Sequence, residues 1–212
     1  MDEYMRYSWD CFLPQKSGIQ VPLFKLIQMN KTADKPCKYL RWDNAGENES
    51  HAQQLCAGND IQLEIPAPNT LQMNGVMERS SATCQNCAFV TMYCARFSLA
   101  TQGLLWPEAM NTITKIGNSL PHLGLALDSH RAWYGSNTVT NWIISHLQSF
   151  GRIAYITNRE KLKAKLDART KNCVFVGGYA QDHSGDTYKF YDHATKHQTI
   201  MSHDVHQWME WH

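Results

Sequence analysis

The fold is decided by two stretches of the sequence, Leu40-Arg-Trp-Asp-Asn-Ala-Gly-Glu47 and Pro68-Asn-Thr-Leu-Gln-Met-Asn-Gly-Val-Met-Glu-Arg79. Asp43 stands at the end of a predicted strand, Lys38–Trp42, and Glu78 stands one turn inside a helix that we predict over 76–97. A strand-end Asp and a helix Glu that converge can share a divalent metal, because carboxylate sites suit Mg²⁺ or Mn²⁺. Paired metals held in this way clamp the attacking and leaving oxygens of a phosphodiester.

A structural interpretation of the same two acids is also available. Asp43 can cap the turn that follows its strand, and Glu78 can support a helix N-terminus, where the helix dipole stabilises acidic side chains. On spacing alone this second interpretation is favoured. The choice between the metal-binding and the structural interpretation therefore depends on the residues around the two acids.

The rest of the first 150 residues alternates strands with helices. We predict strands at Tyr7–Leu13 and Ile61–Ile65, and helices over 18–29, 50–57 and 106–118, the last with Pro107 in its first turn.

From Phe150 onward, short strands are predicted at Arg152–Ile156, Cys173–Gly177, Tyr188–Tyr191 and Thr199–Met201. Strands of this length and spacing are typical of a small barrel, so we place a domain boundary at residues 145–150. A basic block lies across the first of these strands and the loop after it: Arg152, Arg159, Lys161, Lys163, Lys165, Arg169 and Lys171, against Glu160 and Asp167. Such a block is equally compatible with a solvated loop and with contacts to a phosphate backbone.

Together these segments resemble the integrase region of copia-type retrotransposon Pol polyproteins. The two opening stretches match that family's second and third acidic motifs. The other matching segments follow in the same order: Asp2–Trp9, Trp106–Ala109, Asn118, Trp133–Gly135, Leu147, Phe150–Gly151, Leu166–Asp167, Cys173–Gly177, Tyr188, Tyr191–Asp192 and Ser202–Val205. The resemblance covers essentially the whole chain.

The resemblance implies an α/β fold class: an incomplete RNase H-like catalytic core over 1–145, followed by an SH3-like β-barrel module with a C-terminal tail over 146–212. Asp43 and Glu78 would be the second and third acids of a DDE metal triad that binds Mg or Mn. The implied partner would be DNA, and a second copy of the chain is a further possible partner. The implied location would be the nucleus. The nucleic-acid-binding residues would be Arg79, Arg159, Lys161, Lys163, Lys165 and Lys171.

Departures from the family pattern bear on activity. The family's first catalytic Asp has no counterpart here, and its basic run after the third acid is replaced by Ser80-Ser81-Ala82. Two acids hold a metal weakly, and strands that lose their neighbours leave costly unpaired backbone groups. We therefore expect an integrase-derived segment that is inactive by itself in DNA strand transfer. One alternative is a non-catalytic nucleic-acid-binding or interaction protein derived from a transposon, and another is a fragment of a longer functional polyprotein.

The amino-acid composition limits which other classes of protein this chain can belong to. Of the 212 residues 43% are hydrophobic, and 20 Lys and Arg face 19 Asp and Glu, which excludes a strongly basic coat protein. The apolar stretches are too short for a membrane span, and no small-molecule substrate is indicated. We expect no zinc: Cys84 and Cys87 lack further ligands and are predicted, with Cys94, to pack as small helix residues. We expect the C-terminal histidines to be surface or turn residues, and Trp208 to pack back from a terminal tail.

Overall fold

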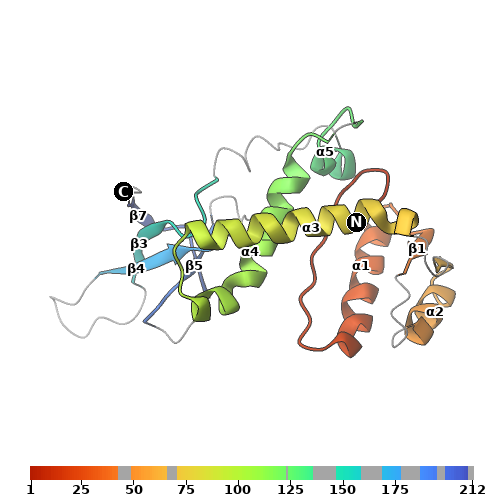
Figure 1. The fold of residues 1–212 in the computed structure, drawn as a ribbon, viewed down its shortest axis with the longest axis horizontal. Helices are drawn as coiled ribbons and strands as arrows, with labels where there is room; N and C mark the ends of the chain where they lie inside the picture. Colours follow the sequence, from red (N-terminus) through yellow and green to blue (C-terminus); the bar gives the residue numbers. More distant parts are fainter. Residues whose placement is uncertain are drawn as a thin grey trace. The chain divides into compact units, whose positions relative to one another are not determined.

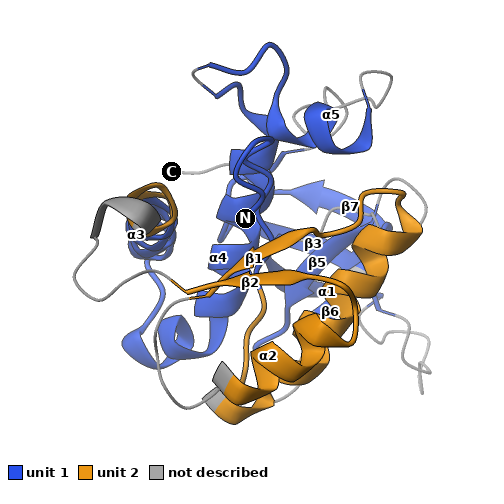
Figure 2. Cartoon of the chain, turned by 90° about the vertical axis from the view of Figure 1, so that its right-hand side faces the viewer, with its two compact units in different colours: residues 1–10, 81–212 blue, residues 11–80 orange. Residues whose placement is uncertain are grey.

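The computed structural model describes residues 1–42, 49–65, 71–122, 124–135, 147–158, 169–177, 187–194 and 199–209. The chain contains two compact units, one formed by residues 11–80 and the other by residues 1–10 with 81–212 (Figure 2). We predicted a division at 145–150 instead. The observed division follows because Phe150, Val176 and Tyr191 share a buried core with the helices that precede them in the sequence.

The unit formed by residues 11–80 begins with a 3-10 turn and a helix and continues as a strand–helix–strand segment. The elements are η1 Lys16–Ile19, α1 Gln20–Thr32, β1 Tyr39–Arg41, α2 Glu49–Ala57 and β2 Gln62–Glu64. β1 and β2 pair in parallel, with Leu40 opposite Leu63. Parallel neighbours need a crossover connection, and α2 lies in that connection.

The core of this unit forms where α1, α2 and the two strands meet. Ile27, Cys56 and Ile61 are buried together. Leu23 lies one turn before Ile27 on α1, and both side chains contact this core because residues four apart share a helix face. The predicted helix at 18–29 and the strands at Lys38–Trp42 and Ile61–Ile65 are thus confirmed, with shorter strands.

Three further helices follow: α3 Leu71–Cys94, α4 Leu99–Ser119 and α5 Ser129–Tyr134 (Figure 1). α4 begins earlier than predicted, so Pro107 lies inside the helix and not in its first turn. The reason is the cap at Ser98, whose hydroxyl accepts a hydrogen bond from the Thr101 amide at 3.2 Å. In the described part of the chain, no helix has the length and apolar character that crossing a bilayer requires.

The predicted strand at Tyr7–Leu13 is wrong, because these residues are in no strand. The side-chain amide of Asn118 takes the place of a strand partner. The Ser8 amide donates to Asn118 Oδ1 at 2.9 Å, and Asn118 Nδ2 donates to the Ser8 carbonyl at 2.8 Å. Beside this contact, the Tyr7 ring stacks on Trp133 with centroids 5.8 Å apart.

The C-terminal strands form one antiparallel sheet in the order β6-β5-β4-β3-β7. The strands are β3 Ile153–Thr157, β4 Thr170–Phe175, β5 Tyr188–Tyr191, β6 Thr199–Ser202 and β7 Val205–Trp208. The four predicted strands are confirmed. Strand β7 was not predicted, and Trp208, which we had assigned to a tail, lies in it and packs against the core of the sheet.

The sheet buries side chains on both faces. One face holds Ala154, Ile156, Cys173, Phe175 and Phe190. The opposite face packs Phe150, Val176 and Tyr191 against Ala88 and Met92 of α3 and Leu105 and Ala109 of α4. Because this second face packs on α3 and α4, the C-terminal strands belong to the same compact unit as those helices.

Candidate functional site

The first acidic stretch is described up to its strand end. The Trp42 amide donates to the Glu64 carbonyl at 2.9 Å, which extends the pairing of β1 and β2 by one residue. Arg41 and Glu64 form an exposed ion pair at 3.2 Å across the same two strands. Asp43 follows directly, and it lies outside the described residues. The structure therefore supports the strand end before Asp43 and does not describe the carboxylate itself.

Glu78 lies on the solvent-exposed side of α3. α3 begins at Leu71 and not at the predicted Val76, so Glu78 stands about two turns inside the helix. The influence of a helix dipole falls off within the first turn. The structural interpretation of Glu78 as a residue that supports the helix N-terminus is therefore weakened, and the carboxylate is available to solvent.

Arg79 is also exposed, and it folds back along α3. Its Nε donates to the Gly75 carbonyl at 3.3 Å, one turn earlier in the helix. This bond engages the Arg79 guanidinium within its own helix. A contact between Arg79 and nucleic acid stays a prediction.

The described residues contain no group of three or more His, Cys, Asp and Glu side chains that could hold a metal ion. Glu78 is the one predicted metal ligand in the described ranges, and a single exposed carboxylate makes a poor metal site. No chemical step can be derived through a metal from these residues.

Some residues of the basic block lie within the ranges that the structure describes, and others lie outside them. Arg159, Lys161, Lys163 and Lys165 lie in 159–168, outside the described residues. Lys171, on β4, places its Nζ 3.6 Å from Oδ2 of Asp192, which is 1% exposed. Burying an unpaired carboxylate is costly, so this lysine stabilises the fold whatever else it contacts.

Arg152 is engaged within the protein as well. Its Nε donates to the Met209 carbonyl at 3.0 Å, a terminal guanidinium nitrogen donates to Gln148 Oε1 at 2.5 Å, and the guanidinium lies 5.4 Å from the Trp208 ring centroid. This cation–π contact and the two hydrogen bonds hold Arg152 against β7. Of the described members of the block, Arg169 is the exposed one.

The cysteines on α3 differ from the prediction. Cys84 is half-buried, and burial raises the pKa of its thiol. Cys87 and Cys94 are exposed and not packed as small core residues. A neutral, half-buried thiol is a weak metal ligand, since the thiolate is the ligating form.

An ion pair between α4 and β5 was missed by the sequence reasoning. Lys189 Nζ lies 2.5 Å from Glu108 Oε1, and both side chains are three-quarters buried. Glu108 belongs to the matched segment Trp106–Ala109, so the resemblance marked the residue without indicating its partner. The partner is 81 positions away, and no local pattern reveals such a pair.

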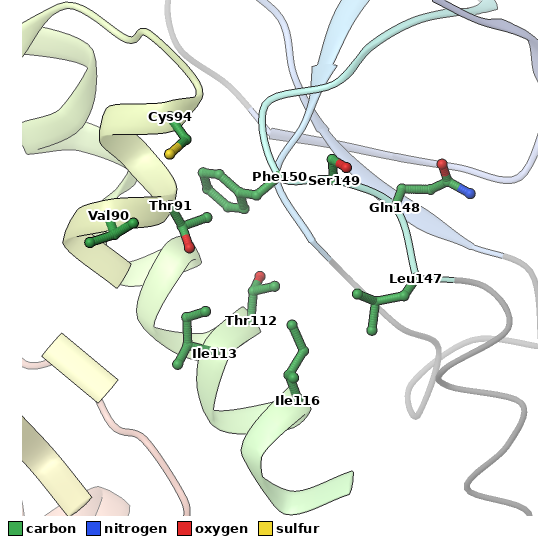
Figure 3. A pocket seen from close by; sticks show the side chains of 10 residues that line it. All are labelled: Val90, Thr91, Cys94, Thr112, Ile113, Ile116, Leu147, Gln148, Ser149 and Phe150. Carbon is green, nitrogen blue, oxygen red and sulfur yellow. The ribbon is translucent and has the colours of Figure 1, made fainter. Parts of the chain in front are cut away.

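A pocket of about 430 Å³ lies beside α3 and α4 (Figure 3). Its wall is largely apolar and comes from three segments. The lining residues are Val90, Thr91, Cys94, Thr112, Ile113, Ile116, Leu147, Gln148, Ser149 and Phe150. No local pattern in the sequence predicts this pocket, because its three segments meet only in the folded chain.

Comparisons with known proteins show what this chain resembles along nearly its whole length. No family model matches. A cryo-EM structure of the simian T-cell lymphotropic virus intasome in complex with PP2A regulatory subunit B56 gamma aligns with a TM-score of 0.41 and 11% identity, over 90% of this chain and 64% of that chain. A retrovirus-related Pol polyprotein from the tobacco transposon TNT 1-94 is 28% identical over 97% of this chain. The chain spans 15% of that polyprotein. The predicted resemblance is therefore confirmed at this level: the chain is similar, along nearly its whole length, to a segment of a retrotransposon Pol polyprotein.

Proposed function

We propose that this chain is an integrase-derived segment that binds nucleic acid and that, by itself, does not catalyse strand transfer. The observation that carries the proposal is the match to a retrotransposon Pol polyprotein over 97% of the chain. The ancestral role would be DNA integration by Mg-dependent transfer of a phosphodiester. Work on chromosomal DNA would require a nuclear location.

The strand connections favour the two domain types that the resemblance implies. The parallel pairing of β1 with β2 across α2 is the connection that an α/β core such as an RNase H-like domain uses. In the C-terminal sheet, β3 pairs with both β4 and β7, the next strand and the last. A short antiparallel sheet in this order supports an SH3-like barrel.

Asp43 and Glu78 are the proposed catalytic and metal-binding acids. Mg²⁺ is bound through one or two carboxylates together with substrate phosphates. Two carboxylates without the family's first acid would bind Mg or Mn weakly and would not bridge a metal pair. The 212-residue chain alone is therefore proposed to be inactive in strand transfer.

Two assays of the whole chain test the catalytic part. The first incubates the chain with Mn²⁺ and labelled DNA ends, and strand transfer that is lost in Asp43→Asn would contradict the proposed inactivity. The second titrates Mn²⁺ by paramagnetic relaxation. Weak saturable binding should disappear in Asp43→Asn/Glu78→Gln and persist in Asp34→Asn/Asp60→Asn. The control also removes two carboxylates, and Asn tolerates the positive φ of both positions. Equal binding in both double variants would show that Asp43 and Glu78 are not the ligands.

Nucleic-acid binding is assigned chiefly to Arg79 and to the basic residues of 159–165. Each lysine that neutralises a phosphate releases about one counterion, so the slope of log K against log salt reports the number of contacts. Replacing Lys161, Lys163 and Lys165 by Ala should reduce that slope by about 3. Removing the exposed Lys25, Lys31 and Lys38 should leave it nearly unchanged. Equal effects of the two triple variants would refute the assignment.

A non-catalytic nucleic-acid-binding protein derived from a transposon is the second candidate. The exposed Arg79 and Arg169 favour it, since neither depends on the acids. The assays separate the candidates: metal binding at Asp43 and Glu78 supports the integrase-derived site, whereas DNA binding without it supports the second.

A further inference from the structure

Two cysteines of the unit formed by residues 11–80 contact the same small core. Cys56, on α2, is 2% exposed and is buried together with Ile27 and Ile61. Cys37, two residues before β1, is partly exposed and packs against the same cluster. Both side chains are reduced thiols. One small core is therefore in contact with two oxidisable side chains that come from different segments of the chain.

Hydrogen bonds to two consecutive residues bring the backbones of these segments together. The Ile61 amide donates to the Cys56 carbonyl at 3.0 Å, and the Gln62 amide donates at 2.9 Å to the carbonyl of Lys38, the neighbour of Cys37. The end of α2 and the residues before β1 are thus both attached to the start of β2 (Figure 2). A disulfide joins Cα atoms about 4.4–6.8 Å apart, which is the spacing of directly neighbouring segments.

The two thiols also influence each other electrostatically. Burial raises the pKa of the Cys56 thiol, and the charge of a Cys37 thiolate raises that pKa further. A like charge acts on a pKa in this way when the two groups are close. The Cys37 sulfur donates to the Tyr39 carbonyl at 3.2 Å, which places this side chain beside the start of β1. The side chains of the two cysteines, and not only their backbones, are therefore neighbours.

The unequal exposure of the two thiols sets the order of an oxidation. Hydrogen peroxide can reach the partly exposed Cys37, whereas Cys56 lies in the core. The Cys37 thiolate attacks one peroxide oxygen, the O–O bond breaks, and the sulfur becomes a sulfenic acid as hydroxide leaves. The Cys56 sulfur then displaces the hydroxyl group, so that an S–S bond forms and the Cys56 proton leaves in water. In sum, two thiols lose two electrons, and the peroxide is reduced to two waters.

We propose that Cys37 and Cys56 are an oxidisable pair that forms a disulfide within the folded chain, with a peroxide as the oxidant. The disulfide ties the segment before β1 to α2 and closes the loop 37–56. Closing a loop stabilises a fold chiefly by restricting the unfolded chain, so oxidation makes this unit more stable. The inference concerns the unit of residues 11–80 alone and does not depend on the proposed function.

Peptide mapping of the full chain tests the proposal. The reduced chain is treated with hydrogen peroxide at neutral pH, alkylated and digested with trypsin. We expect the peptides 32–38 and 42–79, which contain one cysteine each, to be joined with a mass two hydrogens below their sum. The link should form in Cys11→Ser, a matched control at an exposed cysteine of the same unit, and should be absent in Cys37→Ser. No link between these peptides, or oxidation confined to the cysteines of α3, would overturn the proposal.

A second variant covers the case in which Cys37→Ser does not fold. Cys56→Ala leaves an oxidised Cys37 without the thiol that resolves it. Dimedone should therefore label the Cys37 sulfenic acid in this variant and label the wild-type chain much less. Equal labelling of the two proteins would show that Cys56 is not the resolving thiol and would refute the proposal.

Thermal unfolding of the full chain measures the consequence of the link. Oxidation should raise the midpoint of unfolding by about 5 °C or more, and dithiothreitol should reverse the change. Cys37→Ser should show no such rise after the same treatment. An unchanged or lower midpoint in the crosslinked wild-type chain would show that the link does not fit the native fold, which contradicts the proposal.

Discussion

Gly177, two residues after the end of β4, lies against Thr112 of α4, and Gly177→Ala tests that packing. Its φ is +100°, and a Cβ there would lie 2.3 Å from the Thr112 hydroxyl oxygen. That hydroxyl donates to the Glu108 carbonyl at 2.8 Å, so it cannot turn away without losing a bond. A side chain at positive φ costs about 1–2 kcal/mol, and overpacking costs about 1–3 kcal/mol. We therefore expect the free energy of unfolding to fall by about 3 kcal/mol.

Urea unfolding followed by circular dichroism measures this loss, and Thr112→Ala separates its two causes. Removing the Thr112 hydroxyl should relieve the steric part, so Gly177→Ala in that background should cost about 1–2 kcal/mol, the backbone part alone. Gly103→Ala is the control: Gly103 lies in α4 with nothing near its Cβ position, and alanine there should be neutral or stabilising by up to about 1 kcal/mol. A loss below about 0.5 kcal/mol for Gly177→Ala, or an equal loss in both backgrounds, would refute the packing argument.

Three further predictions concern polar groups of the same unit. Lys189→Met should lower the free energy of unfolding by about 1–2 kcal/mol, because it leaves the three-quarters-buried Glu108 carboxylate without this partner; a change within error in urea titration would contradict this. Burial lowers the pKa of His130 despite the nearby Asp128, so the unfolded chain binds the proton more readily and stability should fall as the pH drops below about 6.5. His130→Gln should flatten that pH dependence, and an unchanged profile would assign it to other groups. Burial raises the pKa of Cys173 to about 11, so a thiol reagent at neutral pH should modify the exposed Cys94 and spare Cys173 until the protein unfolds; equal rates for both thiols would show that Cys173 is accessible.

The C-terminal strands could be predicted from sequence because each is a short run of apolar residues between turn residues. β7 could not, because its pairing with β3 includes a register shift between Tyr155 and Ile156 and depends on residues about 50 positions apart. The segment Tyr7–Leu13 shows the opposite failure. Its aromatic residues favour a strand by propensity, yet the backbone of Ser8 is satisfied by a side chain, Asn118. Tertiary contacts overrode local propensity in both places.

The start of α4 was predicted too late, although the residue that caps this helix can be recognised in the sequence. Pro107 is typical of a first helical turn, and that preference masked the Ser98 cap nine residues earlier in the chain. For the candidate site, the strand before Asp43 and the helix that carries Glu78 were predicted, because both depend on strong local patterns. The convergence of the two acids is a long-range property, and it stays a prediction.

Charge counted along a sequence differs from charge that a partner can reach, and the basic block illustrates the difference. Its residues look equivalent in the sequence, but Lys171 lies beside the buried Asp192, and Arg152 is held by Trp208 and two hydrogen bonds. These two cations compensate groups inside the protein, so a phosphate would have to compete with partners already in place. The net charge of the block therefore overestimates the number of cations that a phosphate can reach. If the block binds DNA, its affinity should come from the residues between β3 and β4, and alanine at Lys171 would weaken the fold before it weakened binding.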